Sequence, residues 1–188
     1  MTLIAANVTV APPAGARVLD VGTAAELKAA CEREFATADV LLMSAAVADF
    51  RPAEPSAQKI KKEGSGAQQF DESGGFLLQL VRNPDILAEL AGASNKQAGA
   101  EKPERHLVRV GFAAETHDLV TNAHAKLVAK HLDLLVANDV SRSDSGFGTE
   151  TNKVLIFHAD GTMEDLPVMP KTGVAAAIWD RIVPLLHT

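Results

Sequence analysis

Residues 39–52 read DVLLMSAAVADFRP, a continuous apolar run that leads into small residues, an acid, an arginine and a proline. An apolar run without polar alternation is typical of a strand in the middle of a parallel sheet, and we predict one over Asp39–Ala45. Similar runs predict further strands over Leu3–Val8, Arg17–Val21, Phe76–Val81, Leu107–Ala113 and Leu132–Ala137. The sequence therefore favours a parallel sheet at the centre of the fold.

Segments with helical periodicity separate most of these strands. One begins at Thr23, which forms a capping box with Glu26, and should run to about Phe35. Its buried side is predicted to hold Leu27, Ala30 and Cys31. Further helices are predicted over Asn83–Leu90, Asp118–His131 and Thr172–Leu186. This alternation predicts an α/β fold with a mostly parallel sheet flanked by helices.

Three local signals refine this outline. Asn83 is predicted to be an N-cap, with Pro84 in the first helical position. The apolar side of the helix over Asp118–His131 should hold Leu119, Ala123, Leu127 and Val128. The turn residues Asp160-Gly161 predict a C-terminal β-hairpin, formed by Lys153–His158 and Thr162–Val168. We expect this hairpin to serve as a sheet edge or a dimerisation element.

Composition narrows the class of protein. The chain of 188 residues is long enough for one domain, and its net charge of −6 argues against a broad nucleic-acid surface. A single cysteine, Cys31, excludes a disulfide framework, fits a reducing compartment and is expected to be a small buried hydrophobe. The sequence has no apolar run of membrane-spanning length, and its opening does not resemble a signal peptide. We therefore expect a cytoplasmic protein with no membrane partner.

Polar groups follow several of the predicted strands. In an open parallel sheet, ligands bind beyond the carboxyl ends of the strands, which here are Ala45–Arg51, Gly111–Thr116 and Ala137–Asp139. Small residues after the first strand would let a ligand approach the backbone. Asp49 could coordinate Mg²⁺ between phosphates, or it could be a turn residue or a partner of Arg51.

Several cationic and aromatic residues have two open interpretations. Lys59, Lys61 and Lys62 lie within a polar loop predicted over Pro52–Gly75 and form either a solvated surface or a flap that reaches an oxyanion. Lys126 and Lys130 share a helix face and could bind an anion or remain a solvated stripe. Phe112 could stack on a base or fill the core.

The amides of the helix start at residues 83–86 could bind a phosphate or ribose, or the start could be purely structural. Asn138 and Asp139 form a plausible ligand or turn pair. The histidines lack metal-ligand spacing, so the sequence predicts no zinc site.

Six segments in order, SAAVADFRP, KIKK, NPDIL, GFAAET, KLVAKHLDLLVAND and FGTETNKV, closely resemble bacterial phosphopantothenate–cysteine ligase. That ligase is usually the C-terminal half of a bifunctional coenzyme A biosynthesis protein. The resemblance implies a Rossmann-like fold, a homodimer and a fused or separate decarboxylase. It also implies that CTP activates the carboxylate of 4′-phosphopantothenate as an acyl-cytidylate, which the cysteine amine then attacks, releasing CMP.

The resemblance also implies roles for individual residues. Lys59 matches the family's flap lysine, while Ala45 and Ala46 match the small residues that admit the acyl intermediate. Asp49 is the candidate metal or triphosphate contact. The remaining positions implied to contact CTP are Met43, Ser44, Asn83, Pro84, Asp85, Ile86, Phe112, Lys126 and Lys130. Asn138, Asp139 and the FGTETNKV strand resemble the region near the dimer contact.

One departure from the family concerns the start of the chain. The family begins with a strand, a Gly-rich turn and an SNxSSGKMG segment on its first helix, and this sequence contains none of them. We therefore expect residues 1–188 to form a single ligase domain without its first strand, so that Leu3–Val8 and Val40–Met43 lose a neighbour. A catalytically impaired nucleotide-binding fragment of the same fold is the alternative. A dinucleotide-dependent oxidoreductase lacks support because no Gly-rich fingerprint is present.

Overall fold

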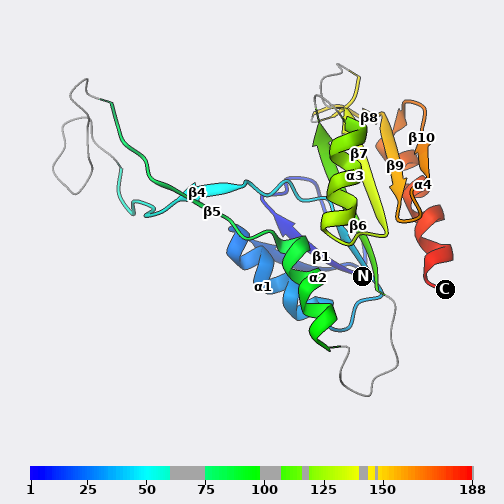
Figure 1. Ribbon diagram of the computed structural model, residues 1–188. Helices are drawn as coiled ribbons and strands as arrows, with labels where there is room; N and C mark the ends of the chain where they lie inside the picture. Colours follow the sequence, from blue (N-terminus) through cyan, green and yellow to red (C-terminus); the bar gives the residue numbers. More distant parts are fainter. Residues whose placement is uncertain (60–74, 98–106, 116–118, 140–143, 147, 188) are drawn as a thin grey trace.

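A computed structural model describes residues 1–59, 75–97, 107–115, 119–139, 144–146 and 148–187. Its main sheet has five strands in the order β10-β9-β7-β6-β3 (Figure 1). They are β3 (Val40–Met43), β6 (Val108–Glu115), β7 (Leu134–Asp139), β9 (Val154–His158) and β10 (Met163–Asp165). The pairs β3–β6 and β6–β7 are parallel, and β9 and β10 continue the sheet as an antiparallel hairpin. The predicted α/β fold and the C-terminal hairpin are confirmed.

Both faces of this sheet are covered, which explains the continuous apolar runs in its strands. On one face, Leu134 and Val136 of β7 pack with Ile178 of α4 (Lys171–Leu185) in one core cluster. On the other, Leu135 and Ala137 pack in a second cluster that draws on three helices. These helices are α1 (Ala24–Phe35), α2 (Ile86–Gln97) and α3 (Leu119–Ala129). Successive β7 residues therefore point to opposite cores, as the two-residue period of a strand requires.

Two further strands form a separate pair. β1 (Thr2–Ala6) and β2 (Arg17–Val21) are parallel and lie in a two-stranded sheet of their own. Among the described strands, β1 pairs only with β2, and β3 pairs only with β6. The predicted strands over Leu3–Val8 and Arg17–Val21 are thus present, but β1 and β3 are not joined by backbone hydrogen bonds. The expectation that a family strand is lacking here stays a prediction.

An antiparallel ribbon extends from the body of the molecule (Figure 1). It consists of β4 (Phe50–Pro52), which was not predicted, and β5 (Leu80–Arg82). The strand predicted over Phe76–Val81 is therefore largely wrong. Leu77, Leu78 and Leu80 are each more than half exposed, because β5 pairs with β4 away from the main sheet rather than joining it. We call these two strands the β4–β5 ribbon.

The predicted helices are present, with corrections at their ends and faces. The capping box of α1 is confirmed, since the Glu26 N–H donates to Thr23 Oγ1 while the Glu26 carboxylate accepts from the Thr23 N–H. The α2 N-cap is wrong: Asp85 Oδ1, not Asn83, accepts the Ala88 N–H at 3.2 Å. The helix also continues to Gln97, beyond its predicted end at Leu90. In α3, Ala123 and Leu127 are buried as predicted, but Val128 is exposed.

Short strand pairs and turns complete the fold. β8 (Thr151–Asn152) and β11 (Met169–Pro170) form an unpredicted antiparallel pair next to the start of α4. In the hairpin turn, Asp160 Oδ1 accepts the Thr162 N–H at 2.8 Å, and Gly161 has φ of 88°, a value that favours glycine. The β8–β11 pair connects the hairpin to the edge of the cavity described next.

Candidate functional site

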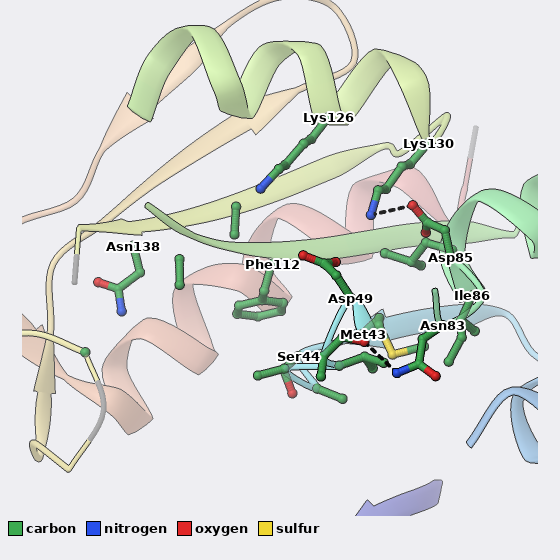
Figure 2. A pocket seen from close by; sticks show the side chains of 18 of the residues that line it. Met43, Ser44, Asp49, Asn83, Asp85, Ile86, Phe112, Lys126, Lys130 and Asn138 are labelled. Carbon is green, nitrogen blue, oxygen red and sulfur yellow. Dashed lines mark hydrogen bonds and ion pairs between the residues drawn. The ribbon is translucent and has the colours of Figure 1, made fainter. Parts of the chain in front are cut away.

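A cavity of about 570 Å³ opens beyond the carboxyl ends of β3, β6 and β7 (Figure 2). Its walls come from the segment after β3, the start of α2, the end of α3 and the chain around β8. This is the edge at which the parallel arrangement predicts ligand binding. The size is within the ordinary range for small-molecule sites, roughly 300–1,000 Å³.

Small residues form the wall that follows β3. Met43 is buried beneath the cavity, and Ser44, Ala45 and Ala46 line it as the chain leaves the strand. The Val47 N–H donates to the Ala45 carbonyl oxygen at 3.1 Å, which turns the chain along the cavity edge. Because these side chains are small, a ligand can reach the backbone here. Their predicted contacts with a nucleotide and an acyl group stay predictions.

Asn83 joins this wall to the start of α2. Its backbone N–H donates to the Asp49 carbonyl oxygen at 2.8 Å, and its side-chain Nδ2 donates to the Ala48 carbonyl oxygen at 2.8 Å. Arg51 donates to the Arg82 carbonyl oxygen at 2.8 Å and to Asn83 Oδ1 at 3.1 Å. The alternative that Asp49 pairs with Arg51 is therefore not seen. Instead, the Asp49 carboxylate points into the cavity (Figure 2).

Charged groups gather where α3 approaches α2. Lys126 and Lys130 both line the cavity, Lys126 with an exposed and Lys130 with a partly buried side chain, so anion binding by these lysines stays a prediction. Lys130 Nζ lies 3.1 Å from Asp85 Oδ2, while the other Asp85 oxygen caps α2. Asp85 thus holds Lys130 at the helix N-terminus, where an anion would also be favoured by the helix dipole. The cavity can therefore bind an anionic group between two lysines and the α2 amides.

Phe112 separates this charged end from a second polar end. Its side chain is 37% exposed and lines the cavity, so the interpretation as a core-filling residue is wrong. Figure 2 shows Phe112 lying between Lys130 and Asn138. Asn138, Gly146 and Asn152 line the cavity beyond it. The Phe112 ring can stack on a flat ligand group such as a base. The asparagine amides next to it can form hydrogen bonds with polar ligand atoms.

Lys59 is the predicted site residue that this cavity does not include. It is exposed on the segment after β4, whereas Asp49 lies in the cavity wall. The predicted convergence of Asp49 and Lys59 on one shared cavity is therefore not seen in this arrangement. The physical reason is that β4 pairs with β5 and leads the chain outward. Lys61 and Lys62 lie outside the described residues.

Other cavity residues were missed by the sequence analysis. Lys171 lines the cavity from the first turn of α4, and its N–H donates to the Glu150 carbonyl oxygen at 3.0 Å. No motif surrounds Lys171 in the sequence, so no signal identified it. Asn152 belongs to the FGTETNKV segment, which we had associated only with a dimer contact. Both residues reach the cavity because the β8–β11 pair lies at its rim.

The chemistry of the donor set limits the possible metal sites. Within the described ranges, no group of three or more His, Cys, Asp or Glu side chains is placed to hold a metal ion. Asp49 and Asp85 line the cavity as carboxylates, and Mg²⁺ is commonly held by one or two carboxylates together with substrate phosphates. Asp49 therefore fits a Mg²⁺ ion that arrives with a polyphosphate.

Two observations concern parts of the chain outside the cavity. Cys31 is buried in the α1 core, and this burial raises the pKa of its thiol, which fits the predicted role as a small hydrophobe. Across the described residues, none of the helices combines the length and apolarity that crossing a bilayer would require.

Known proteins provide a comparison for this fold and cavity. Residues 1–185 match the family described as the DNA/pantothenate metabolism flavoprotein C-terminal domain. The chain is 40% identical over 184 residues to the coenzyme A biosynthesis bifunctional protein CoaBC of Bacillus subtilis, covering 97% of this chain and 41% of that protein. It is 37% identical over 188 residues to a cysteine/cysteine sulfinic acid decarboxylase from an unknown prokaryotic organism, covering 100% of this chain and 47% of that protein. The chain thus spans less than half the length of these relatives.

A solved structure agrees with this comparison. The crystal structure of the C-terminal domain of a coenzyme A biosynthesis bifunctional protein CoaBC superposes with a TM-score of 0.72 at 26% identity. The match covers 99% of this chain and 74% of that one. The predicted Rossmann-like α/β architecture is therefore shared with a solved domain of the same kind.

Proposed function

Because this chain belongs to the DNA/pantothenate metabolism flavoprotein C-terminal domain family, we propose that it is a phosphopantothenate–cysteine ligase of coenzyme A biosynthesis. The name of the relative from Bacillus subtilis, a coenzyme A biosynthesis bifunctional protein, supports this proposal. In the proposed reaction, the carboxylate of 4′-phosphopantothenate displaces pyrophosphate from CTP and forms an acyl-cytidylate. The cysteine amine then attacks the activated carbonyl, and CMP leaves.

The observation that carries the proposal is the cavity at the strand ends, with its lysines and its carboxylate. Lys126 and Lys130 place positive charge where a triphosphate would lie, and Asp49 faces the same space. A bound Mg²⁺ at Asp49 would neutralise part of the triphosphate charge. A carboxylate does not react with an amine until a good leaving group is attached. A site that accepts both a polyphosphate and a carboxylate is therefore what the ligation requires.

The walls of the cavity suit the acyl intermediate. Ala45 and Ala46 leave space for an acyl group beside the backbone, and a closed wall would protect the mixed anhydride from water. We assign Lys59 to a flap that neutralises charge on the reacting oxyanion, which requires the ribbon segment to reach a cavity. We also propose a homodimer, a cytoplasmic location and a decarboxylase that acts on the product, either fused or separate.

Binding and turnover measured on the same preparation test this proposal. Isothermal titration with CTP and Mg²⁺ reports binding, and release of pyrophosphate and CMP with phosphopantothenate and cysteine reports ligation. We expect CTP-dependent product whose yield requires all three reactants, at low turnover for this chain alone. CTP binding without turnover would select the alternative of a nucleotide-binding fragment. Loss of CO₂ from cysteine without CTP would contradict the proposal and favour the activity in the name of the other relative.

Two substitutions assign roles within that experiment. Lys126→Ala removes one cationic group from the cavity and should weaken CTP binding about tenfold, as expected for a charged hydrogen bond. Lys59→Ala should abolish product formation while leaving most of the CTP affinity. Normal turnover by the Lys59 variant would show that the flap role is wrong. Glu54→Gln, an exposed change on the same segment, is the matched control and should change neither quantity.

A further inference from the structure

Ser145 is the buried polar side chain of the described core, with only 4% of its surface exposed. It lies between β7 and β8, and its hydroxyl contacts one asparagine from each strand. Ser145 Oγ is 2.6 Å from Asn138 Oδ1 and 3.1 Å from Asn152 Oδ1. Both asparagines line the cavity, whereas Ser145 does not. A buried hydroxyl thus connects the two amide groups at the end of the cavity beyond Phe112.

The hydrogen bonds around Ser145 determine whether the oxygen or the nitrogen of each asparagine side chain faces the turn that contains Ser145. The Lys153 N–H donates to Ser145 Oγ at 3.0 Å, so the serine oxygen already accepts one bond and has one proton to donate. The shortest contact shows that the hydroxyl donates this proton to Asn138 Oδ1, at 2.6 Å. The Gly146 N–H donates to Asn152 Oδ1 at 2.8 Å, and a backbone N–H requires an oxygen there. The oxygens of both amides are therefore directed into the turn.

This arrangement leaves the Asn138 amide nitrogen as the group offered to a ligand. An asparagine side chain carries one oxygen and one NH₂ group, and fixing the oxygen fixes the nitrogen. Figure 2 shows the Asn138 side chain at the opposite end of the cavity from Lys130. Lys171, which also lines the cavity, follows the β8–β11 pair directly and adds positive charge to the same wall. A hydrogen-bond donor with a cation in the same wall suits an anionic oxygen.

We infer that Ser145 is a positioning residue that orients the Asn138 amide to donate a hydrogen bond to a phosphoryl oxygen of a bound reactant. This inference rests on the proposed function, which supplies two reactants with phosphoryl oxygens, CTP and 4′-phosphopantothenate. Ser145 itself does not touch the ligand. Its contribution is to remove the alternative amide orientation, in which the Asn138 oxygen would face and repel the phosphoryl group.

Substitutions at Asn138 test the orientation directly. Asn138→Ala removes the donor, whereas Asn138→Asp keeps an oxygen for Ser145 but replaces the donor with a negatively charged acceptor. We expect KM for one phosphorylated reactant to rise about tenfold in the alanine variant and further in the aspartate variant. An aspartate variant that binds both reactants as well as the wild type would overturn the inference, because the oxygen would then be facing a ligand donor.

Substitutions at Ser145 test the indirect role. Ser145→Ala should raise the same KM about fivefold with kcat changed less than about twofold, as expected for losing part of one hydrogen bond. Adding Ser145→Ala to Asn138→Ala should have almost no further effect on KM, because the serine acts through the asparagine. Independent, additive effects would show that Ser145 only supports the fold and would overturn the inference.

Thr149→Val is the matched control. In the same turn, Thr149 Oγ1 lies 3.1 Å from the Gly146 carbonyl oxygen and 2.8 Å from the Thr151 carbonyl oxygen, either of which can accept its one proton, and Asn138 is not among these partners. This variant loosens the turn without changing the amide, so it should lower the melting temperature while leaving KM unchanged. A KM increase in Thr149→Val equal to that of Ser145→Ala would overturn the inference.

Separate titrations identify the reactant and keep this test distinct from that of the proposed function. Calorimetry of each variant with CTP alone and with 4′-phosphopantothenate alone shows which affinity falls. Wild-type turnover combined with unchanged affinities in the Asn138 variants would contradict only the positioning role. A wild type that binds one reactant without turnover would contradict the ligase, while the variants still test the amide. A wild type that binds neither reactant would contradict both.

Discussion

The five-stranded sheet and the β4–β5 ribbon contain similar apolar residues but differ in what covers them. Leu134, Val136 and Ile156 in the sheet have no exposed surface, because helices pack on both faces. Leu78 and Leu80, next to and in the ribbon, are about half exposed, and β5 pairs with β4 outside the main sheet. Apolar sequence therefore predicts a strand more reliably than it predicts burial. Stability should reside in the sheet, while the ribbon, which leads into the segment that carries Lys59, can vary without unfolding the body.

The largest expected difference between the two regions is for a leucine truncation. Leu134→Ala should lower the free energy of unfolding by about 2–5 kcal/mol, because it leaves a cavity in the packed sheet. Leu80→Ala, the matched change in the ribbon, should cost less than about 0.5 kcal/mol. Urea denaturation followed by circular dichroism measures both. Equal costs would show that the ribbon is part of the cooperative core.

A smaller effect is expected from adding a methyl group to the sheet. A Cβ on Gly111 of β6 would lie 2.6 Å from Leu132 Cδ1 and 3.2 Å from Leu135 Cδ1. Gly111→Ala should therefore cost about 1–3 kcal/mol through overpacking. Gly92→Ala, at an exposed position of α2 with nothing within 4 Å of the added Cβ, should instead stabilise by about 0.5–1 kcal/mol. If Gly111→Ala and Gly92→Ala shift the melting temperature equally, close packing around Gly111 does not determine the cost of adding a methyl group there.

The helices that cover the sheet should respond to the loss of a cap. Thr23 Oγ1 accepts the Glu26 N–H at 3.1 Å at the start of α1. Thr23→Ala should destabilise the fold by about 1 kcal/mol, and Thr23→Ser should restore most of that loss. Hydrogen exchange at the α1 amides, compared with those of β7, measures whether the effect is local. If Thr23→Ala speeds exchange in β7 as much as in α1, then α1 and the sheet unfold together.

The smallest effect concerns the stability that the fold loses at low pH through a carboxylate at the edge of the sheet. Glu164 of β10 accepts hydrogen bonds from Arg181 of α4, with Nη2 to Oε2 at 2.6 Å, and contacts His158 at 2.8 Å. Arg181 above all lowers the pKa of Glu164 from its usual value near 4.5 to about 2. A lowered folded-state pKa stabilises the fold above about pH 4.5, and the contribution is lost as the pH falls toward 2.

Glu164→Gln should therefore flatten the pH dependence of the melting temperature between these values. At neutral pH the cost should not exceed about 1 kcal/mol, because the side chain is 37% exposed and solvent screens the pair. Glu32→Gln, in an exposed pair with Lys28, is the matched control. If the melting temperature of Glu164→Gln falls at low pH as much as that of the wild type, the ion pair with Arg181 does not stabilise the contact between the hairpin and α4.

Local sequence signals succeeded where the relevant contacts are close along the chain. The capping box of α1 joins residues three positions apart, and the Asp160-Gly161 turn joins residues within a few positions. The α2 start was predicted less well, because Asn83 bonds to Ala48 and Arg51, which lie more than 30 positions away. Any prediction from neighbouring residues assigns such a side chain to the local helix instead.

The candidate site divides in the same way. Asp49, Lys126 and Lys130 were predicted from strand ends, helix spacing and a family resemblance, and the fold brings them to one cavity. Lys171 and Asn152 reach that cavity through the β8–β11 pair, which no local pattern indicated. Lys59 was predicted in the same site but lies on the ribbon segment, because pairing with β5 determines where that segment goes.

The sequence by itself determined the alternation of strands and helices, the buried faces of α1 and the family, since these depend on side-chain periodicity and on short motifs. Only the tertiary structure decided which strands pair, which apolar segment stays exposed and which end of the Asn138 amide is available. Strand pairing and buried hydrogen bonds join residues far apart in the chain, and their energies depend on what else is packed around them.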